Sequence, residues 1–243
     1  MRRHIALVVV ITCFAFAGVS RATEVDGARV VREMHEKYRG AWFTTTRFAQ
    51  KTTTYDDGGK AHVEEWYERI KLPGKLRIDV GPVKDGNAMI LTNGQMTTFK
   101  GGARTDSRPM TSLALLLGFD VYQQSPETTL AQLKHEGVDM AKVHEESWEG
   151  RPVFVVGADR GDLTSNQFWV DKERLLLVRI IAPSDIRFLD YQKQKRGVIA
   201  ARIDVYRKDR LVMSEEYSAI ESDIPLDEAW FDPSKLSAPT PGH

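Results

Sequence analysis

Apolar residues near the start of the chain recur at the spacing of a helix, and the spacing then changes to that of strands. Val30, Val31 and Met34 fall on one helical face, and Asp26 can cap a helix that runs over residues 26–38. The stretch that follows, "AWFTTTRFAQKTTTY", is rich in threonine and aromatic residues, which favour strands. We therefore expect one amphipathic helix followed by a sheet.

Strand-like segments joined by short turns fill most of the remaining chain. Asn93-Gly94 is a two-residue hairpin signal, and Pro73-Gly74 marks another sharp turn. Consecutive strands with such short connections form an antiparallel meander, because parallel strands need long crossovers. The expected strands cover residues 41–55, 60–72, 76–80, 88–92, 95–100, 141–148, 151–158, 165–171, 174–182, 186–193, 198–207 and 211–220.

Two more helices are expected in the middle of the chain. Ser125 and Pro126 can begin a helix that continues to residue 136. The segment "MTSLALLLGF", residues 110–119, is almost wholly apolar and lacks the polar face of an ordinary surface helix. It fits two interpretations equally well: a fixed core helix, or a movable lid over an apolar cavity.

Both faces of the predicted sheet carry bulky apolar residues. In "QFWVDKERLLLVRII", Phe168 and Val170 lie on one face and Trp169 lies on the other. A sheet with one solvated face would alternate cleanly between apolar and polar residues. We therefore expect an α+β fold: a curved, incomplete antiparallel β-barrel of about 11 strands, with helices covering its concave face.

The first 22 residues have the pattern of a cleaved secretory signal peptide. Two arginines precede an apolar run over residues 5–19, and small residues precede a cleavage position after Ala22. The run is short for a membrane span, which needs about 20 apolar residues. We expect export to the periplasm, one lipid-binding domain over residues 23–236 and a flexible tail over residues 237–243.

Cysteine content and charge narrow the classes of partner. The one cysteine, Cys13, lies in the apolar run, so the mature chain would hold no disulfide. Removal of the first 22 residues leaves 31 basic and 34 acidic residues, a net charge near −3. This charge gives no electrostatic reason to bind nucleic acid or an anionic membrane surface.

Residue types used in catalysis and metal binding are present but form no recognisable motif. None of the six histidines pairs with a cysteine or carboxylate at ligand spacing, and no glycine-rich phosphate loop follows a strand. Glu64 and Glu68 share one strand face and could perform acid–base chemistry, but a solvated strand face is the more common explanation. We expect no metal, no cofactor and no enzymatic activity; the glutamate pair is the single candidate for an enzyme.

Several short motifs resemble those of the periplasmic lipoprotein-carrier family, the LolA-like superfamily of outer-membrane lipoprotein-sorting proteins. They are the "F-x-Q" strand at Phe48-Ala49-Gln50, the turn and strand "PGKLR" over residues 73–77, the Asn93-Gly94 hairpin and the closing pattern "EEYSAIESDIPLDEAWFDPSKL". In these carriers an arginine directly precedes the wall proline and hydrogen-bonds the lid. Leu72 occupies that position here, so the chain departs from the family pattern.

The resemblance implies a monomer that holds lipid or lipoprotein acyl chains in an apolar cavity closed by helices. Partners could include the lipoprotein machinery of the inner or outer membrane. The alternative is an envelope sensor or interaction module that uses the same fold without lipid transfer. The side chains expected to line the cavity and its lid are Phe48, Trp66, Ile70, Leu76, Ile78, Ile90, Leu113, Leu116, Leu117, Phe119, Phe168 and Leu177.

Overall fold

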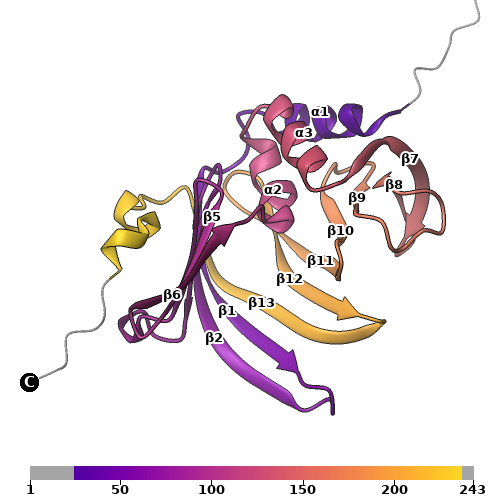
Figure 1. Ribbon diagram of the computed structural model, residues 1–243. Coiled ribbons are helices and arrows are strands. Elements are labelled where there is room, and N and C mark those ends of the chain that lie inside the picture. The colour runs from indigo at the N-terminus through magenta and orange to yellow at the C-terminus, as the bar shows by residue number, and fades with distance from the viewer. Residues whose placement is uncertain (1–24, 237–243) are drawn as a thin grey trace, which may run out of the picture.

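One antiparallel sheet of 13 strands, open at both edges, forms the framework of the protein (Figure 1). The computed structural model describes residues 25–236, so the expected signal peptide and C-terminal tail lie outside the described residues. The strands are β1 (Thr45–Tyr55), β2 (Ala61–Lys71), β3 (Lys75–Val80), β4 (Ala88–Thr92), β5 (Gln95–Lys100), β6 (Ala103–Pro109), β7 (Asp139–Trp148), β8 (Arg151–Gly157), β9 (Gln167–Asp171), β10 (Leu177–Ile181), β11 (Asp185–Lys193), β12 (Val198–Arg207) and β13 (Arg210–Ser222).

Two meanders, β1 to β6 and β7 to β13, join at the middle of the sheet. The joint is the pairing of β1 with β13, which extends from Thr46 opposite Ser222 to Thr54 opposite Met213. The first and last strands are therefore central, and β6 and β7 are the two edges. Figure 1 shows that the sheet is strongly curved, with a hollow side and a convex side. We call these the inner and outer faces.

The expected meander is confirmed, but the count of about 11 strands is too low, and the twelve expected strand ranges are one fewer than the 13 strands of the sheet. The strand missing from the sequence prediction is β6, whose residues are all exposed. Its sequence, "ARTDSRP", has no buried face and therefore no apolar alternation to reveal it. A polar, exposed composition is typical of an edge strand that is protected against pairing with another chain.

Three α-helices gather at one end of the inner face (Figure 1). Each begins at a residue whose side chain accepts a backbone hydrogen bond, as N-caps do. The α-helices, with their N-cap residues in parentheses, are α1, Gly27–Tyr38 (Asp26); α2, Leu113–Gly118 (Ser112); and α3, Pro126–His135 (Ser125). The 3-10 helices are η1, Val83–Asp85; η2, Asp120–Tyr122; η3, Glu228–Phe231; and η4, Pro233–Lys235. None of the helices in residues 25–236 is long and apolar enough to cross a membrane.

The main core lies between these helices and the inner face. Trp42 stacks on Tyr122 with ring centroids 3.9 Å apart, and Tyr38 meets both rings edge-on. Phe168 and Val170 belong to this core, whereas Trp169 belongs to a small cluster on the outer face. The prediction that both faces of this strand are covered is confirmed.

Buried ion pairs cover part of the outer face. Asp79, fully buried, accepts hydrogen bonds from Arg69 and Arg77, each at 2.7 Å. The indole of Trp230 lies against both guanidinium groups, with ring-centre distances of 4.0 and 4.7 Å. These contacts attach the C-terminal helix η3 to the back of β2 and β3.

Candidate functional site

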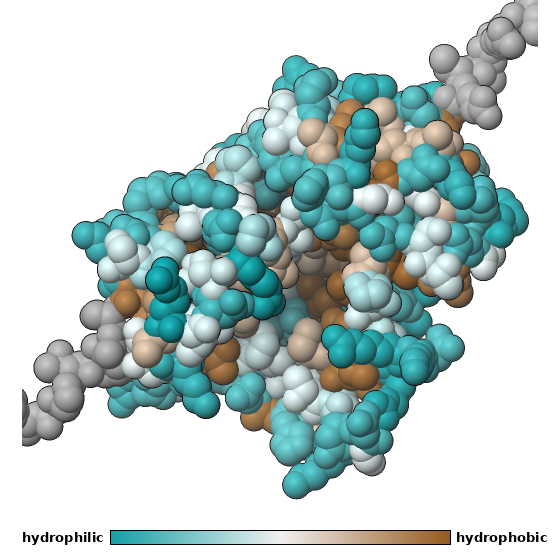
Figure 2. Space-filling view, in the orientation of Figure 1, coloured by the Kyte–Doolittle hydropathy of each residue, from teal (hydrophilic) through white to brown (hydrophobic). Residues whose placement is uncertain are grey.

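Apolar side chains that are only partly buried line the inner face of the sheet beyond the helices. They lie on strands from both halves of the sheet, next to the main core. We call this surface the trough; it comprises Ile78, Met89, Ile186, Val205 and Tyr217. Figure 2 shows a hollow in the middle of this side of the molecule with hydrophobic side chains at its floor.

Most residues predicted to line the cavity are packed in the main core instead of facing an open space. Each is at most 9% exposed, and the leucines of α2 contact the sheet directly. The packed residues are Phe48, Ile70, Leu76, Leu116, Leu117, Phe119, Phe168 and Leu177. Three predicted residues remain partly exposed, namely Trp66, Ile78 and Leu113. The accessible apolar surface is therefore the trough beside α2.

Ile90, which was expected to line the cavity, lies on the outer face of the sheet. It lies directly opposite Arg77, and opposite residues of antiparallel strands share a face. Arg77 belongs to the outer-face ion-pair cluster, so Ile90 is buried there and not near the trough. The strand "AMILT" has apolar residues on both faces, so its sequence alone could not assign the faces.

The expectation of a solvated strand face holds for Glu64 but is wrong for Glu68. Glu64 is exposed, whereas Glu68 is only 7% exposed. Glu68 lies opposite Phe48 and Ile78, so its carboxyl group belongs to the inner face. Burial raises the pKa of Glu68 well above its ordinary value, and the negative charge of Glu215 raises it further.

A buried carboxyl group joins the segment after α2 to the wall of the sheet. Asp120, the first residue of η2, accepts a hydrogen bond from the backbone N–H of Gly74 at 2.9 Å. Gly74 lies in the turn between β2 and β3. Burial raises the pKa of Asp120 to about 7, and the Gly74 hydrogen bond offsets part of that effect. The position of α2 is thus coupled to a group that titrates near neutral pH.

Solved structures with a similar arrangement of elements are known. No protein-family model matches the sequence, and no curated protein matches it. A DUF1329 family protein from Desulfovibrio piger superposes with a TM-score of 0.58 at 16% identity, covering 87% of this chain and 98% of its own.

Two further solved structures are similar to the chain over most of its length. A putative outer membrane lipoprotein-sorting protein domain from Vibrio parahaemolyticus gives a TM-score of 0.55 at 13% identity, over 86% of this chain and 97% of its own. A LolA superfamily protein from Nitrosomonas europaea gives 0.52 at 13% identity, over 86% and 98%. The chain has a LolA-like fold. At these identities the similarity concerns the fold alone.

The turn that carries the wall proline differs from the LolA-like pattern. The sequence resemblance places an arginine before Pro73, but Leu72 stands there and packs against the main core. The contact between this turn and the helical segment is made instead by Asp120 and the Gly74 backbone. A carboxyl group on the helical side thus makes the contact that, in the carriers the sequence resembles, an arginine on the wall side would make. Asp120 carries no sequence signal of this contact, because a single aspartate after an apolar segment forms no motif.

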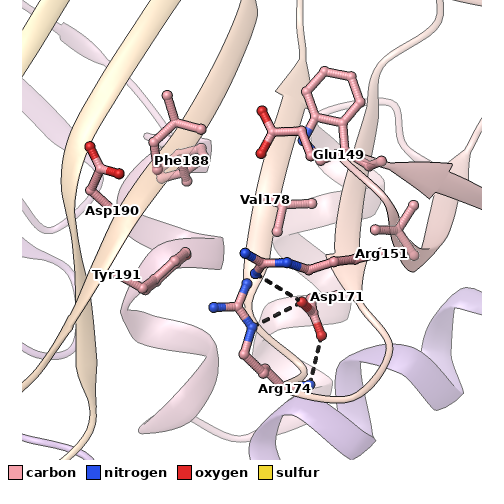
Figure 3. Close-up of a pocket in the computed structure, with 11 residues that line it drawn as sticks. Glu149, Arg151, Asp171, Arg174, Val178, Phe188, Asp190 and Tyr191 are labelled. Atoms are coloured by element: carbon pink, nitrogen blue, oxygen red, sulfur yellow. Dashed lines mark hydrogen bonds and ion pairs between the residues drawn. The ribbon is translucent and has the colours of Figure 1, made fainter.

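A separate polar pocket of about 240 Å³ opens where β10 and β11 diverge (Figure 3). The two strands pair only over Arg179–Ile181 and Asp185–Arg187, and beyond these residues β11 is paired with β12 alone. Arg174 donates to Asp171 at 2.9 Å, and Arg151 lies 3.7 Å from the same carboxylate. Although burial opposes it, the hydrogen bonds from Arg174 hold the pKa of Asp171 below its usual value.

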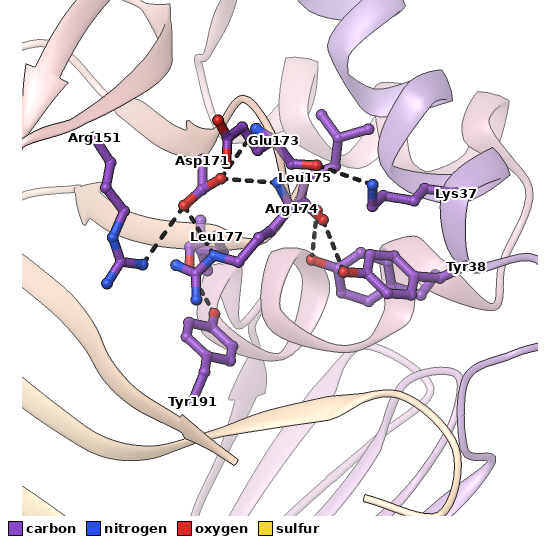
Figure 4. Close-up of polar contacts among 10 residues, drawn as sticks. Lys37, Tyr38, Arg151, Asp171, Glu173, Arg174, Leu175, Leu177 and Tyr191 are labelled. Atoms are coloured by element: carbon purple, nitrogen blue, oxygen red, sulfur yellow. Dashed lines mark hydrogen bonds and ion pairs between the residues drawn. The ribbon is translucent and has the colours of Figure 1, made fainter. Parts of the chain in front are cut away.

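The turn between β9 and β10 is anchored to α1 by backbone-directed hydrogen bonds (Figure 4). Tyr38 donates its hydroxyl to the Arg174 carbonyl at 2.7 Å, and Lys37 donates to the Glu173 carbonyl at 2.9 Å. Asp171 accepts from the backbone N–H groups of both turn residues. This network fixes α1 on the sheet of the LolA-like fold, so the helical end of the trough has a rigid support.

Two further large depressions lie away from α2, and Val205 of the trough lines the larger of them. One of about 840 Å³ is at the tips of the β1–β2 and β12–β13 hairpins, and one of about 820 Å³ lies beside the segment that follows β13.

Within residues 25–236, no group of three or more histidine, cysteine or acidic side chains is placed to hold a metal ion.

Proposed function

We propose that this protein is a periplasmic carrier that shelters acyl chains, of lipids or of lipoproteins, against the apolar floor of the trough. The observation that carries the proposal is the incomplete burial of Ile78, Met89 and Ile186 on a concave surface beside α2. Water-exposed apolar surface on a concave face is the usual form of a ligand site. Burying an acyl chain there gains about 0.8 kcal/mol for each methylene group.

Helix α2 supports this role because its apolar sides already cover the neighbouring part of the same face. Leu116 and Leu117 are almost wholly buried against the core, whereas Leu113 and Ala114 are partly exposed. A small outward displacement of α2 would extend the trough over apolar residues that it covers now. Binding requires no catalytic group, because the acyl chain is transferred by partition and not by a chemical step.

The proposal is tested by purifying the chain from residue 23 onward and searching for bound lipid by mass spectrometry. A fluorescent fatty-acyl probe is then titrated into the delipidated protein. We expect co-purified amphiphile and saturable probe binding. A protein without bound lipid and without probe binding, but with a stable envelope-protein partner, would favour the sensor or interaction module instead.

A matched pair of variants locates the binding surface. Ile186→Gln places a polar amide in the trough, whereas Val63→Gln makes a comparable change at a position that is 60% exposed on β2. We expect weaker probe binding for Ile186→Gln only, with both variants folded by circular dichroism. Equal affinity in the two variants contradicts a ligand in the trough.

A further inference from the structure

A pair of carboxyl groups lies on the inner face among the apolar residues of the trough. Glu68 is opposite Phe48 on β1, and Glu215 is opposite Thr52 on the same strand. Gln50 lies between these two positions, opposite both Trp66 and Tyr217. Since opposite residues share a face, all of these side chains point to the same side of the sheet.

The polar atoms of this group are incompletely partnered within the protein. Tyr217 donates to Glu215 at 3.0 Å, and Gln50 donates its amide N–H to Thr52 at 2.8 Å. Among residues 25–236, Glu68 has no hydrogen-bond or ion-pair partner, although it is only 7% exposed. The side-chain oxygen of Gln50 is buried and also accepts no hydrogen bond. Buried polar groups normally have partners, so the Gln50 oxygen indicates a missing one, and the carboxyl group of Glu68 is free to accept hydrogen bonds from the same ligand.

The outer face shows how the same sheet treats buried or partly buried carboxylates that have only a structural role. Asp79, Asp185 and Asp204 each lie within 2.7 Å of an arginine nitrogen. Neither Glu68 nor Glu215 has a basic residue in ion-pair contact within the described part of the chain. The fold thus supplies a cation to each of those outer-face carboxylates and none to the inner pair.

The surroundings of the inner pair suit an organic cation attached to an apolar chain. Phe48 and Tyr217 stack with centroids 4.1 Å apart, and Trp66 lies on the same face. Aromatic faces and carboxylates both attract ammonium groups, and burial strengthens these attractions. Burial raises the pKa of both glutamates, which is the cost that a bound cation would offset.

We propose that Glu68 and Glu215 bind the primary ammonium group of an amphiphile whose alkyl chain lies along the trough. This inference rests on the proposed function, and it names the chemical class of the polar end of the ligand. Glu68 would supply the unpartnered acceptor, and Glu215 and the Gln50 oxygen would accept the remaining N–H groups. A lipid with an amine headgroup has this chemistry.

Three probes with one alkyl chain separate headgroup recognition from apolar binding: octylamine, 1-octanol and octanoate, titrated by calorimetry at pH 7.5. The wild-type protein is expected to bind octylamine at least about tenfold more tightly than octanol, a ratio that corresponds to about 1.4 kcal/mol. Octanoate is expected to bind more weakly than octanol, because its negative charge would be buried beside two acidic groups that have no cation next to them.

Variants of the glutamates complete the test. In Glu68→Gln and Glu215→Gln the octylamine preference should fall to a ratio near one, while octanol affinity stays the same. Glu64→Gln is the matched control, because it removes an exposed carboxylate from the same strand face and should keep the full preference. The Glu68→Gln and Glu215→Gln variants should remain folded, because each removes the free-energy cost of burying a carboxyl group.

The outcomes distinguish the two proposals. If octanol binds but octylamine binds no more tightly, or if Glu68→Gln keeps the preference, the ammonium site is wrong and the apolar carrier stands. If none of the three probes binds to the wild-type protein, the carrier proposal itself fails, and this inference fails with it.

Discussion

The carboxyl group of Asp120 accepts a hydrogen bond from the backbone N–H of Gly74, and this contact joins the end of α2 to the β2–β3 turn. It lies in a site that is only 4% exposed. Because Asp120 follows α2 almost directly, any outward movement of that helix must strain or break this bond. The protonation state of one aspartate therefore affects how firmly the helix is held.

The pH dependence of stability should report on Asp120. Its pKa is raised from 3.8 to about 7 by burial, so the folded state binds a proton that the unfolded state has released between these values. The contribution of this bound proton to the free energy of unfolding is fully present below pH 4 and is lost as the pH rises through 7. A shift of this size corresponds to at most about 4 kcal/mol.

Asp120→Asn separates this effect from other titrating groups. The amide oxygen can still accept from Gly74, but no charge has to be buried. We expect the difference in unfolding free energy between variant and wild type, measured in urea, to grow in favour of the variant from pH 5 to pH 8. A difference that does not change with pH would show that Asp120 does not titrate in this range.

Loss of the outer-face counter-ion should be costly. Asp79→Asn leaves the buried guanidinium groups of Arg69 and Arg77 without their carboxylate, and breaking a buried ion pair costs about 3–5 kcal/mol. The control is Glu216→Gln, which removes an exposed pair with Lys51 that is worth less than about 1 kcal/mol. Urea unfolding of both variants measures the contrast; equal losses would mean that the outer cluster is not a structural clamp.

The leucines of α2 should differ in their contribution to stability. Leu116 is 1% exposed, and truncating a buried leucine to alanine typically costs 2–5 kcal/mol. Leu113 is partly exposed, so Leu113→Ala should cost clearly less. Thermal or urea unfolding tests this order. If Leu116→Ala is neutral, α2 is not packed on the sheet in solution, and the helix behaves as a free lid.

Local patterns in the sequence were sufficient to predict the strands that have a buried face, because burial imposes apolar alternation. They also predicted all three helices, for which a capping residue and an apolar face coincide. They could not reveal β6, which buries nothing. Nor could they reveal the central pairing of β1 with β13, because its partners lie between 159 positions (Thr54 and Met213) and 176 positions (Thr46 and Ser222) apart in the sequence.

The candidate site was less predictable than the fold for a related reason. Period-two alternation groups residues by face but does not say which face is hollow, so Ile90 was placed with the wrong group. The burial of Glu68 depends on β1 and β3, its neighbours on either side, and not on its own strand. The role of Asp120 arises from a contact between residues 46 positions apart.

Photo-crosslinking gives the most direct test of the carrier proposal. A fatty acid with a photoreactive diazirine on its chain is bound, irradiated and mapped by peptide mass spectrometry. We predict labelling of the inner-face peptides that contain Ile78, Met89 or Ile186, with competition by unlabelled fatty acid. Labelling that is not competed, or that falls on outer-face positions such as Val63, would contradict an acyl-binding trough.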